Sequence, residues 1–141
     1  MKKKIAILLP YKEKYTLNDA AAASIWVKDY LKTSHLNSQT VVFGNLPKKN
    51  KPLTNNFVNI NLSNVKFKKN YFYTKKFYTI YEMSKFEIIE IHNRPESLIF
   101  LLKKKLNCKF IFIYHNNPQD LRCSKTIKER LFIANNCDQI F

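Results

Sequence analysis

Short apolar runs alternate along the chain with segments whose apolar residues recur at helical spacing. The run at residues 4–9 has no polar alternation, which is typical of a strand covered on both faces of a parallel sheet. Residues 57–62 alternate apolar with polar side chains, which predicts an edge strand. The remaining predicted strands cover residues 40–43, 86–91 and 110–114, and another begins at residues 139–141.

Helices are predicted in the segments between these strands. They cover residues 20–32, 71–83, 96–105 and 125–135. Asn18 or Asp19 is expected to cap the first helix and Ser124 the last, while Pro95 suits the first turn of the third. The apolar stripe of the first helix is expected to contain Ile25, Trp26, Val27 and Tyr30.

The repeated order of strand, loop and helix predicts an α/β fold. We expect a Rossmann-like open, mostly parallel sheet with helices on both faces and right-handed crossovers. The length of 141 residues suits a single domain, residues 1–141. The last predicted strand has no helix after it, so we expect a domain truncated at its C-terminal end.

Composition excludes several classes of protein. A hydrophobic content of 45% argues against disorder. The sequence contains no apolar run near the ~20 residues of a membrane-spanning helix. The apolar start lacks the cleavage site of a signal peptide, so a cytoplasmic location is predicted. The single glycine, Gly44, excludes glycine-rich dinucleotide loops and Walker loops.

The three cysteines are Cys108, Cys123 and Cys137. Their odd number and wide spacing predict reduced thiols rather than a disulfide framework or a zinc site. The formal charge is +15, but only three of the 25 basic residues are arginine. Since arginine grips phosphate and base edges bidentately, we treat the lysine excess as background and the arginines as candidates for specific binding.

Polar clusters follow three of the predicted strands. In an open parallel sheet, ligands bind at the carboxyl ends of the strands. We therefore expect Arg94 and His115 to line one pocket, with His92 beside them and Glu13 across it. Either histidine alone would equally suit a hydrogen-bonding role within the fold. No carboxylate pair lies at these ends, so no metal is predicted. The clusters cover residues 10–19, 92–95 and 115–118.

Four groups of residues at these ends form an ordered set: residues 8–10 with Glu13 and 19–29; residues 91–95; residues 114–118 with 121–126, Glu129 and Arg130; and residues 138–141. In order and spacing they resemble the N-terminal domain of family 4 glycosyltransferases. The similarity is greatest to bacterial members that act on lipopolysaccharide and other surface glycans. It covers nearly the whole chain and is weakest over residues 46–85.

The resemblance implies the acceptor-side half of a retaining enzyme with the GT-B fold, in which two Rossmann-like domains face each other across a cleft. Such an enzyme moves a sugar from a nucleotide-sugar donor to a glycan acceptor, here expected to be lipid-linked, without a further cofactor. The donor would bind a C-terminal domain that these 141 residues lack, so the isolated chain is expected to be inactive. By resemblance, His115 is catalytic. The implied substrate-binding residues are Glu13, Asn18, Ala21, Ala22, His92, Asn93, Arg94, Asn116 and Arg122.

Two alternative functions stay open. Residues 66–73 interleave lysines with aromatic rings, as nucleic-acid stacking platforms do. Helical spacing would bury several of those rings, and the sequence matches no known RNA-binding motif, which disfavours nucleic acid as a partner. The chain could also be an inactive remnant of a longer gene. Separately, residues 66–85 suit either peripheral binding to an anionic membrane or a solvated lysine face over a buried aromatic stripe.

Overall fold

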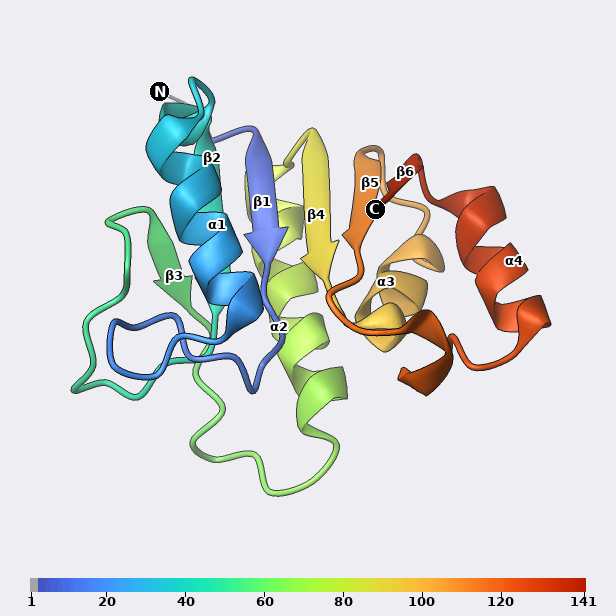
Figure 1. Cartoon of the computed structure of the whole chain (residues 1–141), viewed down its shortest axis with the longest axis horizontal. Coiled ribbons are helices and arrows are strands. Elements are labelled where there is room, and N and C mark those ends of the chain that lie inside the picture. Colours follow the sequence, from blue (N-terminus) through green and yellow to red (C-terminus); the bar gives the residue numbers. More distant parts are fainter. Residues whose placement is uncertain (1–2) are drawn as a thin grey trace.

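The computed structural model describes residues 3–141, which form an open, all-parallel, six-stranded sheet flanked by four helices (Figure 1). The strand order is β3-β2-β1-β4-β5-β6. The chain reverses its direction across the sheet between β1 and β4, as in Rossmann-like folds. The predicted fold class is confirmed. The strands are β1 (Ile5–Leu8), β2 (Thr40–Gly44), β3 (Phe57–Asn59), β4 (Ile88–His92), β5 (Lys109–Ile113) and β6 (Gln139–Ile140).

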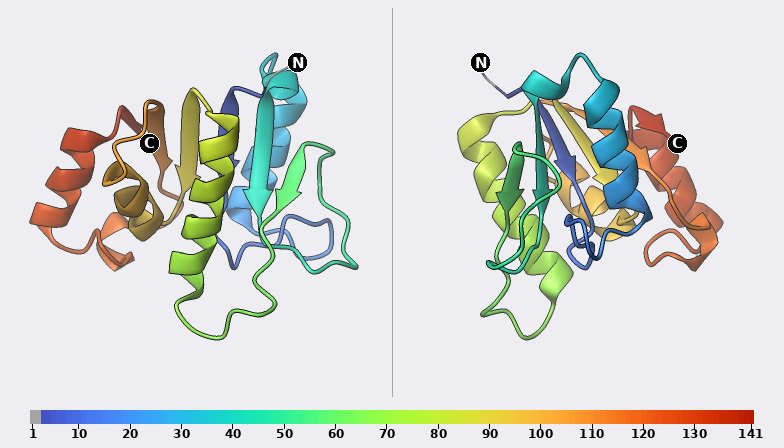
Figure 2. Two further views of the ribbon diagram at one scale, coloured as in Figure 1. Left: turned by 180° about the vertical axis from the view of Figure 1, so that it is seen from behind. Right: turned by 60° about the vertical axis from the view of Figure 1, so that its left-hand side comes forward.

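The helices lie on both faces of the sheet (Figure 2). One face is covered by α1 alone, while α2 and α3 pack side by side on the other, with α4 next to α3. This division follows from right-handed crossovers, because α1 connects strands in one direction across the sheet and the other three in the opposite direction. The helices are α1 (Ala22–Thr33), α2 (Lys69–Ser84), α3 (Pro95–Leu102) and α4 (Ile127–Asn136), with 3₁₀ turns at Asn37–Gln39 and Pro118–Asp120.

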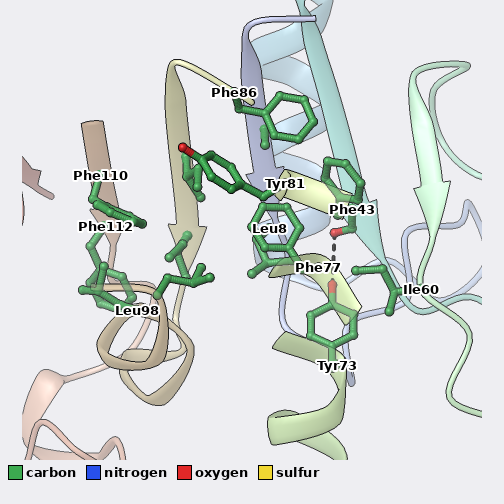
Figure 3. Packing of buried hydrophobic residues seen from close by; sticks show 14 of the residues in the cluster. Leu8, Phe43, Ile60, Tyr73, Phe77, Tyr81, Phe86, Leu98, Phe110 and Phe112 are labelled. Carbon is green, nitrogen blue, oxygen red and sulfur yellow. Dashed lines mark hydrogen bonds between the residues drawn. The ribbon is translucent and has the colours of Figure 1, made fainter. Parts of the chain in front are cut away.

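The larger core lies between the sheet and the pair α2 and α3 (Figure 3). Phe43 of β2 meets Phe77 of α2 edge to face, with ring centroids 5.0 Å apart. The hydroxyl of Tyr73 donates to the Leu9 carbonyl at 2.8 Å, so this polar tip is satisfied although the residue is buried. These contacts confirm the helical spacing predicted for residues 71–83. A smaller cluster that includes Ile7, Val27 and Leu31 lies under α1.

The buried stripe and the cap of α1 differ from the prediction. Ala23, Ser24, Val27 and Leu31 are buried, whereas Ile25 and Trp26 are 46% and 41% exposed and Tyr30 is half-buried. The side of α1 that faces the sheet carries Ala23, Val27 and Leu31, which recur at helical spacing. The Glu13 carboxylate accepts a hydrogen bond of 3.0 Å from the Ser24 amide in the first turn of this helix.

Neither predicted residue caps α1, since its N-cap is Ala21. Asp19 instead pairs with Lys14 at 3.2 Å. The distant Glu13 performs the capping function, because its carboxylate satisfies an amide of the first turn. A helix cap supplied from outside the local sequence leaves no capping signal beside the helix.

The start of α4 is also two residues later than predicted. The N-cap is Thr126 rather than Ser124, and it forms a capping box with Glu129. The Thr126 hydroxyl accepts from the Glu129 amide at 3.2 Å, and the Glu129 carboxylate accepts from the Thr126 amide at 2.9 Å. Ser124 is buried and donates to the Pro118 carbonyl at 2.7 Å, which holds the loop between β5 and α4.

Other boundaries are shifted as well, and strand β3 ends at Asn59 rather than at residue 62. Helix α3 ends at Leu102 rather than at residue 105, because Lys105 adopts a left-handed φ of 51°. Strand β4 runs to His92, which brings that histidine into the sheet. Within residues 3–141, no helix is long and apolar enough to cross a membrane.

Candidate functional site

The carboxyl ends of β1, β4 and β5 lie next to one another at one edge of the sheet. The loops that leave these strands carry most of the side chains singled out in the sequence. The structure divides them between the two faces of the sheet, so they form two groups rather than one.

The first group is a chain of hydrogen bonds on the α1 side of the sheet. Glu90 and His92 are two residues apart in β4, so their side chains point to the same face. The Glu90 carboxylate lies 2.7 Å from His92 Nε2, and His92 Nδ1 lies 2.8 Å from His115 Nε2. Glu90 and His92 are buried and His115 is half-buried. We call Glu90, His92 and His115 the histidine relay.

The buried carboxylate at one end determines the tautomers along the relay. An ionised Glu90 only accepts hydrogen bonds, so His92 donates from Nε2. A neutral His92 then has a lone pair on Nδ1, which accepts from the Nε2–H of His115. His115 therefore carries its own lone pair on Nδ1, an atom without a hydrogen bond inside the described chain. The relay presents a hydrogen-bond acceptor at its outer end.

The electrostatic surroundings keep His115 neutral. Burial lowers the pKa of His115 below its ordinary value of 6.5, and the neighbouring His92 lowers this pKa further. The carboxylates of Glu13 and Glu90 oppose this shift but do not reverse its direction. With His92 neutral as well, the neutral His115 keeps its lone pair on Nδ1.

Trp26 forms a wall beside the relay. Its ring centroid lies 5.4 Å from that of His92 and 6.4 Å from that of His115, and it stacks on Tyr30 at 5.5 Å. Sequence reasoning missed both Trp26 and Glu90. Glu90 had a signal, since it is a single carboxylate within a strand of otherwise apolar, buried composition. Trp26 had none, because its exposure depends on the phase of α1.

The second group surrounds a cavity of about 620 Å³ on the α2 and α3 side of the sheet edge. Arg94 and Arg122, two of the predicted substrate-binding residues, both line it. We call it the basic cavity. Its lining is Tyr11, Lys12, Lys68, Lys69, Asn70, Tyr71, Thr74, Arg94, Glu96, Phe100, Arg122 and Cys123.

Arg94 lines the basic cavity, whereas His92, His115 and Glu13, which were expected to share a pocket with it, do not. The physical reason is Asn93, which has a left-handed φ of 54° and ends the alternation of side chains along β4. His92 and Arg94 therefore belong to different sides of the sheet edge, although only one residue separates them.

The other predicted site residues have mixed positions. The Asn93 side chain accepts a hydrogen bond of 3.4 Å from the His115 amide, so it belongs to the relay loop. Asn18 and Asn116 are exposed in loops. Ala21 and Ala22 form the start of α1 and are exposed.

Comparison with known proteins identifies no relative of this chain. No protein-family model, no curated protein and no solved structure matches it. Residues 3–141 contain no group of His, Cys, Asp and Glu arranged to hold a metal ion. A functional interpretation therefore depends on the relay, the basic cavity and the sequence motifs described above.

Proposed function

We propose that the chain is the acceptor-side half of a retaining glycosyltransferase. The complete enzyme would move a sugar from a nucleotide-sugar donor to a bacterial surface glycan, such as lipopolysaccharide, while the acceptor is still lipid-linked. The observation that carries the proposal is the histidine relay at the carboxyl edge of a Rossmann-like sheet. It ends on His115, the residue that the sequence resemblance assigns to the reacting sugar.

The geometry of the relay suits this chemistry. Nδ1 of a neutral His115 would accept a hydrogen bond from a hydroxyl of the transferring sugar. Positive charge that develops on the sugar ring in the transition state would be stabilised by an imidazole whose hydrogen-bond partners end on the Glu90 carboxylate. Because Glu90 and His92 are buried, the orientation of the His115 ring is set before substrate binds.

Trp26 supports the same assignment. It offers a large, half-exposed ring beside His115, and such a ring has both an apolar face and a polar N–H. A sugar has a similar division between its apolar C–H face and its hydroxyl rim. We therefore place the sugar between Trp26 and His115.

The proposal assigns the nucleotide-sugar donor to a second, C-terminal domain and the enzyme to the cytoplasmic face of the membrane. Transfer requires both substrates to be held in one geometry. The 141-residue chain alone is therefore expected to bind acceptor glycan without transferring sugar to it.

Saturation-transfer NMR with surface-glycan oligosaccharides tests this assignment. We expect the wild-type chain to bind glycan. The change His115→Ala removes a hydrogen bond worth roughly 1 kcal/mol, so it should weaken binding several-fold. The matched control is His35→Ala, since His35 is exposed and outside the site, and it should leave glycan binding unchanged. An absence of glycan binding, or an equal loss in both variants, would overturn the proposal. Sugar transfer by the chain alone would overturn the assignment of the donor to another domain.

A further inference from the structure

The basic cavity concentrates positive charge that nothing within the described chain neutralises. Five cationic side chains line it, against the single carboxylate of Glu96. None of the five makes an ion pair within residues 3–141. Like charges gathered around one cavity raise the local positive potential, so the cavity attracts an anion. The five are Lys12, Lys68, Lys69, Arg94 and Arg122.

Arg94 shows most directly that a partner is missing. Its Nε is buried and has no hydrogen-bond acceptor anywhere in residues 3–141. Its guanidinium carbon lies 5.8 Å from the centroid of the Tyr11 ring, a cation–π contact that holds the side chain at the cavity wall. A buried donor without an acceptor costs stability, and an anion in the cavity would supply the acceptor.

Backbone groups add to the positive potential. Helix α2 begins at Lys69 and α3 at Pro95, so both helices have their N-terminal ends at the cavity. The amides of α2's first turn have no side-chain cap, and that turn contains no acidic residue. Helix N-termini favour anions through these amides and through the helix dipole.

The remaining wall is aromatic. Tyr71 and Phe100 meet edge to face with their centroids 5.6 Å apart, and Tyr11 completes this side of the cavity. The volume of about 620 Å³ is that of a site for a small organic molecule rather than for a bare anion. The ligand should therefore combine a compact, doubly charged group with a ring.

We propose that the basic cavity binds a phosphorylated sugar. The phosphate lies between Arg94 and Arg122, whose guanidinium groups suit bidentate contacts to phosphate oxygens, and the sugar ring lies against Tyr11 and Tyr71. The inference of a phosphate group depends on the cavity alone, whereas the inference of a sugar depends on the proposed function. A phosphate on the acceptor glycan would thus be recognised on one side of the sheet edge while His115 acts on the other.

Calorimetric titration of the whole chain with glucose 1-phosphate tests the proposal. We expect saturable binding, at least tenfold tighter than that of inorganic phosphate, and no binding of glucose. Three results would each overturn it: no binding of glucose 1-phosphate, equal affinity for inorganic phosphate, or tighter binding of uridine diphosphate.

Paired variants locate the site. The double change Arg94→Gln with Arg122→Gln should lower the affinity for glucose 1-phosphate at least tenfold. Lys125→Gln with Lys128→Gln removes the same charge from exposed positions outside the cavity lining, and it should change affinity less than twofold. An equal loss in both pairs would overturn the site. Arg122→Gln alone, at an exposed residue, provides the same test if the double variant does not fold.

Two further experiments are needed. The first asks whether the sugar phosphate is lipid-borne or soluble, and the second tests the cavity independently of the proposed function. Co-sedimentation with phosphatidylcholine vesicles that contain lipid A, against vesicles of equal charge made with phosphatidylglycerol, distinguishes a lipid-borne sugar phosphate from a soluble one. If the chain binds lipid A vesicles more tightly than phosphatidylglycerol vesicles, the sugar phosphate is lipid-borne. If it binds both equally, the sugar phosphate is soluble. The second experiment compares ligands and variants. If glucose 1-phosphate binding depends on Arg94 and persists in His115→Ala, but the chain binds no glycan, the cavity proposal stands and the proposed function fails.

Discussion

At the scale of single residues, the most consequential arrangement is an imidazole whose tautomer is determined by a carboxylate two hydrogen bonds away. Glu90 has no contact with the outer end of the relay, yet it determines that His115 presents a lone pair there. Protonation of His115 on Nδ1 would convert this outer acceptor into a donor, while its Nε2–H would still donate to His92. The state of the site therefore depends on pH.

We expect His115 to titrate below 6.5, with a direct effect on stability. Burial and the neighbouring His92 lower the pKa of His115 in the folded chain, so the unfolded chain binds this proton more readily. The contribution of His115 to the free energy of unfolding is complete above pH 6.5 and decreases as the pH falls below that value. Urea denaturation at a series of pH values measures this dependence.

The variant His115→Gln should show a flatter dependence of stability on pH below 6.5, and His35→Gln should retain the wild-type slope. NMR titration of the His115 ring proton, in the folded chain and in urea, provides the direct comparison. A higher titration midpoint in the folded chain than in urea would contradict the expected direction.

At the scale of elements, the helices α1 and α4 begin by different means. The amide of Ser24 in α1 bonds to a carboxylate eleven residues earlier in the chain, whereas α4 begins with a local capping box. The first arrangement couples the helix to the loop after β1. The second depends only on residues next to the helix.

The change Thr126→Ala should lower the free energy of unfolding by about 1 kcal/mol, because it removes the side-chain oxygen that accepts from the Glu129 amide. Urea denaturation measures the change. A suitable control is Thr79→Ala in the interior of α2, where the exposed hydroxyl bonds only to the Lys75 carbonyl, and this change should cost little or nothing. Equal destabilisation by both variants would show that the capping box contributes nothing specific.

At the scale of the whole molecule, positive charge and exposed aromatic rings occur together over residues 66–85. Tyr73 and Phe77 belong to the core, as a buried stripe requires. Phe67 is 81% exposed, however, and Phe72 is partly exposed. All six lysines of the segment are exposed. The segment therefore combines a buried stripe with a basic, aromatic outer surface.

We predict that this surface binds anionic membranes. Each lysine near an anionic lipid surface contributes roughly 1 kcal/mol, and exposed rings add apolar burial at the interface. Co-sedimentation with phosphatidylglycerol vesicles at low salt should detect binding that weakens as salt is added.

The change Lys66→Gln with Phe67→Ser should reduce membrane binding. The matched pair Ile127→Ser with Lys128→Gln, which also removes one exposed apolar residue and one exposed lysine, should not. No sedimentation of the wild-type chain at low salt would remove the membrane prediction.

Much of this architecture could be predicted from the sequence, because apolar runs and helical spacing determine strands and helices locally. Val41 and Phe112, for example, are buried in strands at the positions expected. The stripe of α1 is expected on its larger side chains, whereas the buried side carries Ala23, Val27 and Leu31 at helical spacing. The division of the site could not be predicted, because it follows from the left-handed backbone of Asn93. Asparagine tolerates that conformation but does not require it.

The position of β1 in the middle of the sheet affects how the chain can fold while it is being synthesised. Ile5 of β1 pairs on one side with Thr40 and on the other with Ile88. Before β4 has been made and has left the ribosome, β1 can pair only with β2, and its other edge is unpaired. Such non-local parallel pairing is slow and leaves an aggregation-prone intermediate. A strand whose four residues are all buried in the finished fold therefore has one unpaired edge until β4 is in place.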